Sequence, residues 1–175
     1  MNKAVFLDRD GVLNEDPGYV HKVEHFKLFP GVIEGLKLLK DFKLIIITNQ
    51  SGIGRGYYSE DDFHNFNNHL VDELKKCGIK IEKTYYCPHH PDDKCDCRKP
   101  SIKLLNKAVD EFNIDLKESW VIGDHPHDIK MGKTAGCKAI YMLTGHGKKH
   151  KAELVDIKPD LVTESFLEAV KFIIK

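Results

Sequence analysis

The stretch Ala4-Val5-Phe6-Leu7-Asp8-Arg9-Asp10-Gly11 decides which fold the sequence predicts. Its first four residues are all apolar, which is typical of a parallel strand buried on both faces. Asp8 and Asp10 follow directly, and Gly11 allows a sharp turn. In an open parallel sheet, ligands bind at the carboxyl ends of the strands. The two acids project to the same side, so we expect a divalent cation, Mg2+, to relieve their mutual repulsion.

The composition indicates a globular domain that acts on a small molecule. The chain has 175 residues, of which 41% are hydrophobic, so we expect one domain spanning residues 1–175. Acidic and basic residues balance at 27 each, which predicts neither a nucleic-acid partner nor a membrane partner. The sequence shows no apolar run of about 18 residues and no secretory leader, which favours a cytoplasmic location. Without a long apolar surface stripe, we expect a monomer.

Strand and helix patterns alternate along the rest of the chain. Apolar runs predict further strands at 44–47, about 83–86, 120–123 and 138–142. Helical spacing predicts helices at 30–39, 59–77, 101–112 and 166–173, and a short helix that ends at residue 135. Residues 12–29 are predicted to form a loop. This alternation predicts an α/β three-layer sandwich with a mainly parallel, Rossmann-like sheet.

Polar side chains follow several of the predicted strands. Thr48 and Asn49 close the second strand and Asp124 closes the fourth, while Lys99 lies in a loop that can reach them. Because parallel strands end at one edge of a sheet, we expect these groups to converge on Asp8 and Asp10. Carboxylates, a hydroxyl and an ammonium group are the parts that phosphoryl transfer needs. The sequence therefore predicts a small phosphorylated substrate.

A cysteine-rich loop over about 87–97 predicts a second metal site. Cys87, His89, Cys95 and Cys97 supply three thiolates and an imidazole, enough for a closed, structural zinc site. His90 is an alternative ligand. The ion would order a loop that has no apolar core of its own, and so would hold the neighbouring Lys99 at the active edge.

The clusters Asp8-x-Asp10-Gly11, Thr48, Lys99 and Gly123-Asp124-x-x-x-Asp128 resemble the motifs of the haloacid dehalogenase superfamily of phosphatases. This resemblance implies that Asp8 attacks phosphorus and that Asp10 protonates the leaving oxygen and later activates water. It implies that Thr48 and Lys99 hold the phosphoryl group. It also implies that Asp8, the carbonyl of Asp10, and Asp124 bind Mg2+.

The cysteine loop and two further segments narrow the resemblance. Residues 87–100, 16–20 and 48–53 are similar to the D,D-heptose 1,7-bisphosphate phosphatases and the related histidinol-phosphate phosphatases. This likeness implies a compact enzyme without a large cap domain. The substrate it favours is D-glycero-D-manno-heptose 1,7-bisphosphate, from which the enzyme would remove the 7-phosphate. The residues it implies for substrate binding are Asp16, Pro17, Gly18, Tyr19, Asn49, Gln50, Ser51 and Arg98.

Two departures from the sequence pattern of this family leave the identity of the substrate open. A different class of protein is a further alternative. Ser101-Ile102-Lys103 stands where many relatives have proline, glycine and methionine, and the cysteine loop is short. Histidinol phosphate, or another small phosphomonoester, therefore remains an alternative substrate. A phospho-accepting receiver-like domain, which also places acids, Thr and Lys on a parallel sheet, is a more remote alternative. The sequence assigns no role to Arg55, His125, His127 or Asp128.

Overall fold

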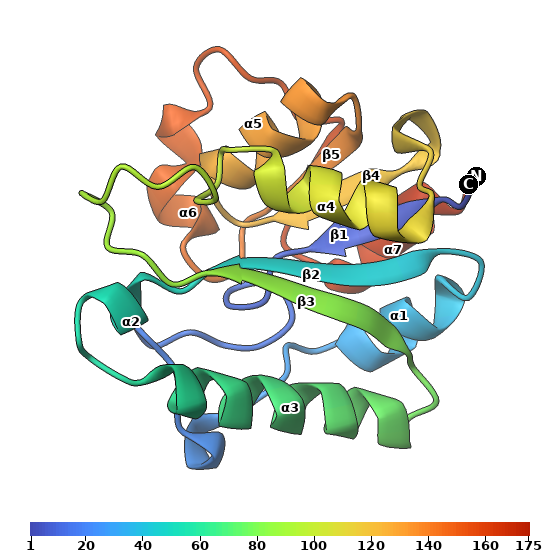
Figure 1. The fold of residues 1–175 in the computed structure, drawn as a ribbon. Helices are drawn as coiled ribbons and strands as arrows, with labels where there is room; N and C mark the ends of the chain where they lie inside the picture. The colour runs from blue at the N-terminus through green and yellow to red at the C-terminus, as the bar shows by residue number, and fades with distance from the viewer.

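A single parallel sheet forms the centre of the computed structural model, which describes residues 1–175 (Figure 1). The strands are β1 (Ala4–Leu7), β2 (Lys43–Asn49), β3 (Ile81–Cys87), β4 (Trp120–Gly123), β5 (Lys138–Met142) and β6 (Leu161–Thr163). Their order across the sheet is β3-β2-β1-β4-β5-β6, and every neighbouring pair is parallel. β1 is therefore flanked by β2 and β4, and its carboxyl end lies at the middle of the sheet edge.

Helices cover both faces of this sheet. The helices α1 (Val32–Leu38), α3 (Glu60–Lys76) and α7 (Phe166–Ile173) share one core cluster. The helices α4 (Lys103–Phe112) and α5 (Pro126–Ala135) contribute to the cluster on the opposite face, and Figure 1 shows them across the sheet from α1 and α3. Short turns of helix connect these elements, namely η1 (Val23–His25), α2 (Ser51–Gly54), η2 (Leu116–Glu118), α6 (Gly147–His150) and η3 (Lys151–Glu153).

The central strand shows why its apolar run has no polar interruption. Val5 and Leu7 pack into the cluster of α1, α3 and α7, whereas Ala4 and Phe6 pack into that of α4 and α5. All four side chains are fully buried. Because successive side chains of a strand point to opposite faces, both alternating sets must be apolar when both faces are covered.

Several predicted elements agree closely with the structure. The predicted bounds of β4, β5 and α7 coincide with the observed ones. Ser59 caps α3, and its hydroxyl accepts a hydrogen bond from the Asp62 amide while the Asp62 carboxylate accepts one from the Ser59 amide. This reciprocal pair is a capping box, which stabilises the helix start.

Other elements differ from the prediction. β2 continues through Thr48 and Asn49, so both residues belong to the strand itself. The first helix begins at Val32 after Gly31, whose φ of 81° lies in the left-handed region, so the expectation that Pro30 forms the first helical turn is wrong. The edge strand β6 was not predicted, because three residues with one buried side chain leave no periodic signal.

None of the helices combines the length and the apolar character needed to cross a membrane.

Candidate active site

A cavity of about 480 Å³ opens at the carboxyl edge of the sheet. It gathers residues from the ends of β1, β2 and β4 and from the loops around residues 16–19, 98–99 and 146–150. All the residues predicted for catalysis, substrate binding or magnesium binding line it, except Pro17. These lining residues are Asp8, Asp10, Asp16, Gly18, Tyr19, Thr48, Asn49, Gln50, Ser51, Arg98, Lys99 and Asp124.

Lys99 lies at the centre of the charged groups in the cavity. Its Nζ is 3.1 Å from Asp8 Oδ1 and 2.6 Å from Asp128 Oδ1, and it donates a hydrogen bond of 2.9 Å to the Ile47 carbonyl. The side chains of Lys99, Asp8 and Asp128 are only 4%, 13% and 1% exposed. Three acceptors match the three N–H groups of the ammonium, so the position of Lys99 is fixed by its surroundings. Asp128 therefore belongs to the site, although the sequence assigned it no role.

The three carboxylates outnumber this single ammonium. Ligand oxygens of Asp8, Asp124 and Asp128 lie within 4.8 Å of one another. Burial raises the pKa of Asp8 well above its usual value, partly offset by Lys99. Burial, together with the Asp128 charge, raises the pKa of Asp124 to about 7. Burial lowers the pKa of Lys99, but Asp128 and Asp8 raise it more, so the ammonium stays charged. The residues thus fit a divalent cation that would offset the excess negative charge.

The Asp124 carboxylate is held against the backbone of the turn after β1. A Cβ atom added at Gly11 would lie 2.1 Å from Asp124 Oδ2, and Gly11 has a φ of 86°. The same Oδ2 accepts a hydrogen bond of 2.8 Å from the His146 amide, and Thr144 Oγ1 donates one of 2.6 Å to the Gly11 carbonyl. Only glycine allows both this backbone conformation and this close approach.

The side-chain partners of Asp10 differ from those of Asp8. Arg9 binds it through both Nε and Nη2, each at 2.9 Å, and Asn14 Nδ2 donates a third hydrogen bond at 3.0 Å. Gln50 Nε2 donates the fourth, at 2.9 Å. The Arg9 guanidinium is buried, with its carbon 5.2 Å and 4.7 Å from the ring centroids of Phe63 and Phe66 on α3. Arg9 was not predicted as a site residue, because nothing in its spacing distinguishes it from a surface arginine.

The amides of Asn49 and Gln50 bind protein groups. Asn49 Oδ1 accepts from the Lys99 amide at 3.0 Å, and Asn49 Nδ2 donates to the Lys99 carbonyl at 3.4 Å. Gln50 Nε2 donates to Thr48 Oγ1 at 2.8 Å as well as to Asp10. Both residues line the cavity, as their predicted role in substrate binding requires, and their amide groups also hold neighbouring parts of the site in place.

The loop after β1 reaches across the cavity to the loop after β5. Asp16 Oδ1 accepts a hydrogen bond of 2.9 Å from the Gly18 amide, and Asp16 Oδ2 lies 3.3 Å from His146 Nε2. Tyr19, which follows Gly18, has a φ of 53° and packs edge-on against Tyr57, with 4.9 Å between their ring centroids. Pro17 is exposed and does not line the cavity. Arg55 lies outside the lining as well.

Histidines form one wall of the cavity. Nδ1 of His125 accepts a hydrogen bond of 3.1 Å from the His127 amide, and the side chain caps α5. Burial lowers the pKa of His125 to about 4 and also lowers that of His127. His125 is therefore neutral near pH 7, and because Nδ1 accepts, its proton is on Nε2. An Nε2–H group is a hydrogen-bond donor and a poor metal ligand.

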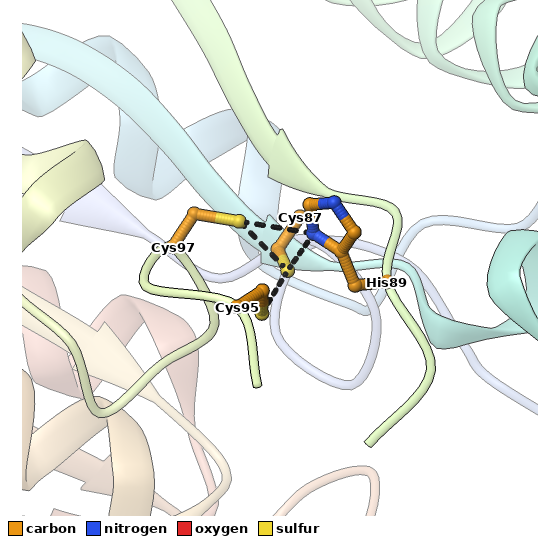
Figure 2. Close-up of side chains that lie close together, drawn as sticks. All are labelled: Cys87, His89, Cys95 and Cys97. Carbon is orange, nitrogen blue, oxygen red and sulfur yellow. Dashed lines mark hydrogen bonds between the residues drawn. The ribbon is translucent and has the colours of Figure 1, made fainter. Parts of the chain in front are cut away.

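The cysteine loop brings together the four side chains predicted to bind zinc (Figure 2). Cys87 Sγ lies 3.1 Å from Cys97 Sγ, 3.7 Å from Cys95 Sγ and 3.5 Å from His89 Nδ1. Two thiolates on one tetrahedral zinc ion lie about 3.8 Å apart, so this arrangement fits the ion with small adjustments. His90 points elsewhere, since its Nδ1 accepts a hydrogen bond from the Asp92 amide at 3.1 Å.

Comparison with known proteins agrees with this geometry. The HAD-hydrolase-like family matches residues 96–169. A D-glycero-beta-D-manno-heptose-1,7-bisphosphate 7-phosphatase from Haemophilus ducreyi is 41% identical, covering 98% of both chains. A D-glycero-alpha-D-manno-heptose-1,7-bisphosphate 7-phosphatase from Campylobacter jejuni is 44% identical over 84% of this chain and 86% of its own. The crystal structure of D,D-heptose 1,7-bisphosphate phosphatase from B. bronchiseptica, complexed with magnesium and phosphate, covers 98% of both chains with a TM-score of 0.89 and 27% identity.

The fold and the site define a haloacid dehalogenase-like hydrolase of phosphoric monoesters, without a large cap domain. Within that class, the chain belongs to the family of D-glycero-D-manno-heptose-1,7-bisphosphate 7-phosphatases. The receiver-domain alternative is wrong, because receiver domains have the flavodoxin-like strand order 2-1-3-4-5, whereas this sheet has the order 3-2-1-4-5-6.

Proposed function

We propose that this phosphatase removes the 7-phosphate of D-glycero-D-manno-heptose 1,7-bisphosphate. The observation that carries the proposal is that one cavity offers two places for anionic groups. Lys99, together with the Mg2+ that the Asp8, Asp124 and Asp128 carboxylates would attract, would form the first. Arg98 would form the second, because it lines the same cavity and its guanidinium fork can bind a phosphate. The names of the relatives support a sugar that carries two phosphates.

In the proposed reaction, Asp8 is the nucleophile and Asp10 the proton-transfer group. Arg9 and Lys99 both contact Oδ1 of Asp8, which leaves Oδ2 to attack phosphorus and form an aspartyl phosphate. Asp10 gives a proton to the leaving sugar oxygen and later takes one from the water that hydrolyses the intermediate. Thr48 Oγ1 accepts from Gln50, so its own O–H is free to donate to a phosphoryl oxygen.

We propose that Mg2+ binds at Asp8, Asp124 and the carbonyl of Asp10. The close carboxylates and the raised pKa values of Asp8 and Asp124 support a cation there, as does the magnesium in the B. bronchiseptica structure. When bound, Mg2+ would neutralise charge on the transferring phosphoryl group. Asp128 would then serve mainly to hold Lys99, because its Oδ1 lies 2.6 Å from Nζ.

We also propose that Cys87, His89, Cys95 and Cys97 bind a structural Zn2+. The ion would tie the end of β3 to the residues just before Arg98 and Lys99, and so would place both basic side chains at the cavity. None of the five cysteines forms a disulfide, which suits a reducing compartment and supports a cytoplasmic location. Residues 1–175 are proposed to act as one domain and as a monomer.

The experiment is phosphate release with Mg2+ from the α- and β-anomers of the heptose bisphosphate and from histidinol phosphate, under identical conditions. We expect kcat/KM for one heptose anomer to exceed that for histidinol phosphate by at least about a hundredfold, since only the bisphosphate engages both anion sites. An Asp8→Asn variant serves as the inactive control. Preference for histidinol phosphate would refute the proposed substrate while leaving the phosphatase chemistry unchanged.

A further inference from the structure

Tyr58 makes a buried contact next to the catalytic groups that the proposed mechanism does not use. The residue lies between α2 and α3 and is 7% exposed. Its hydroxyl donates a hydrogen bond of 2.6 Å to Oε1 of Gln50. Burial raises the pKa of Tyr58, with a further rise from the Asp10 charge, so the phenol keeps its proton and remains a donor.

The Tyr58 ring has little freedom to move. It stacks on His21 with 4.7 Å between ring centroids and an interplanar angle of 13°. The backbone at Gly52 lies so close to the ring that a Cβ atom added there would be 2.1 Å from Cε1 of Tyr58. The hydroxyl is therefore presented to Gln50 from a fixed position.

Gln50 links this hydroxyl to two groups of the proposed reaction. Its amide nitrogen donates to Asp10 Oδ2 at 2.9 Å and to Thr48 Oγ1 at 2.8 Å, which uses both of its N–H groups. Gln50 is 2% exposed, and the Tyr58 hydroxyl is the hydrogen-bond partner of its Oε1. Without that partner, a buried carbonyl would lose its hydrogen bond and the amide would be free to shift.

We propose that Tyr58 is a positioning residue that acts through Gln50 to hold Asp10 in its reactive arrangement. No proton passes through Tyr58. The proton that reaches the leaving oxygen comes from Asp10, and the phenol hydrogen stays on Tyr58 throughout. This inference rests on the proposed role of Asp10.

The Tyr58→Phe variant tests the inference through its dependence on the leaving group. An alkoxide leaving group needs a proton from Asp10, whereas p-nitrophenolate leaves without one. We therefore expect kcat/KM to fall about tenfold for the heptose bisphosphate and by less than about threefold for p-nitrophenyl phosphate. A variant that only loosened the fold would lower both values by similar factors.

Tyr85→Phe is the matched control. Tyr85 is also 7% exposed and also donates a hydrogen bond of 2.6 Å, but its acceptor is Glu111, away from the cavity. We expect it to keep the wild-type kcat/KM on both esters. Thermal melting of both variants compares the losses of stability caused by removing one hydroxyl.

A double variant separates action through Gln50 from direct action. In a Gln50→Met background, removal of the Tyr58 hydroxyl is expected to have no further effect on kcat/KM, because the link is already broken. Equal losses on the two esters, or additive losses in the double variant, would overturn the inference. A wild-type protein that released phosphate from neither ester would instead contradict the proposed function.

Discussion

Replacing Asp124 with Asn tests whether the carboxylate cluster at the sheet edge is built for a cation. Burial, with a contribution from Asp128, raises the pKa of Asp124 from 3.8 to about 7. A shift of this size means that ionising Asp124 costs about 4 kcal/mol more in the folded protein than in the unfolded chain. Asn cannot ionise, so at every pH the variant lacks the free-energy cost of a buried ionised carboxylate.

The sign of the effect follows from proton binding. The folded protein binds the Asp124 proton more tightly than the unfolded chain does, so ionisation of this carboxyl opposes folding. Below the unfolded pKa both states are protonated and the cost is absent. It grows as the pH rises through the window from 3.8 to about 7, and it is complete above that window. Metal-free wild-type protein should therefore lose about 4 kcal/mol relative to Asp124→Asn across this window.

Urea unfolding of both proteins across this pH window, first with a chelator and then with Mg2+, measures the effect. Mg2+ at about a hundred times its dissociation constant should stabilise the wild type by about 2.7 kcal/mol above pH 7, and Asp124→Asn far less. Asp156→Asn, which removes an exposed carboxylate, controls for the change in net charge. Parallel pH dependences for the wild type and Asp124→Asn, or equal stabilisation by Mg2+, would show that Asp124 is not part of a cation site.

Two further substitutions test the other charged groups. Lys99→Met leaves the buried carboxylates of Asp8 and Asp128 unpaired, so metal-free urea unfolding should show a loss of about 3–5 kcal/mol. An unchanged stability would show that Lys99 does not compensate these charges. Cys97→Ser should lower the zinc content, measured by mass spectrometry of the metal, by about one ion per chain, whereas Cys77→Ser should retain it. Full zinc content in Cys97→Ser would contradict the proposed ligand set.

The parts of the site that could be predicted from the sequence are those that follow from local rules. Asp8, Thr48 and Asp124 end β1, β2 and β4 or lie within two residues of their ends, and parallel strands bring such ends to one edge. The residues of the cysteine loop were predictable as a group because cysteine and histidine at this density are typical of a metal site.

The parts that could not be predicted depend on contacts between distant residues. Thr144 and Gly11, which are hydrogen-bonded, are separated by 133 positions, and no spacing rule links them. The loop after β5 contributes His146, and the end of a fifth strand at the same edge could have indicated that this loop joins the site. The Gln50 amide likewise donates a hydrogen bond to Asp10, which lies 40 positions earlier in the chain.

The two acids of the opening motif have different surroundings, which supports the different roles proposed for them. Arg9 stands between them in the sequence and serves both, since its amide donates to Asp8 Oδ1 at 2.8 Å while its guanidinium binds Asp10 at two points. Arginine fits this position better than lysine because only its planar fork can bind a carboxylate twice. The rings of Phe63 and Phe66 on α3 hold that fork in place.

Asp8, by contrast, faces Lys99 and the other carboxylates. Burial and the repulsion among these acids raise the pKa values of Asp8 and Asp124 and make a cation favourable at this point. The negative charge that would recruit Mg2+ is thus concentrated around the nucleophile, while Asp10 is kept apart by four hydrogen bonds from Arg9, Asn14 and Gln50. The different cations that these two identical side chains meet support the proposed division into a metal-binding nucleophile, Asp8, and a proton-transfer group, Asp10.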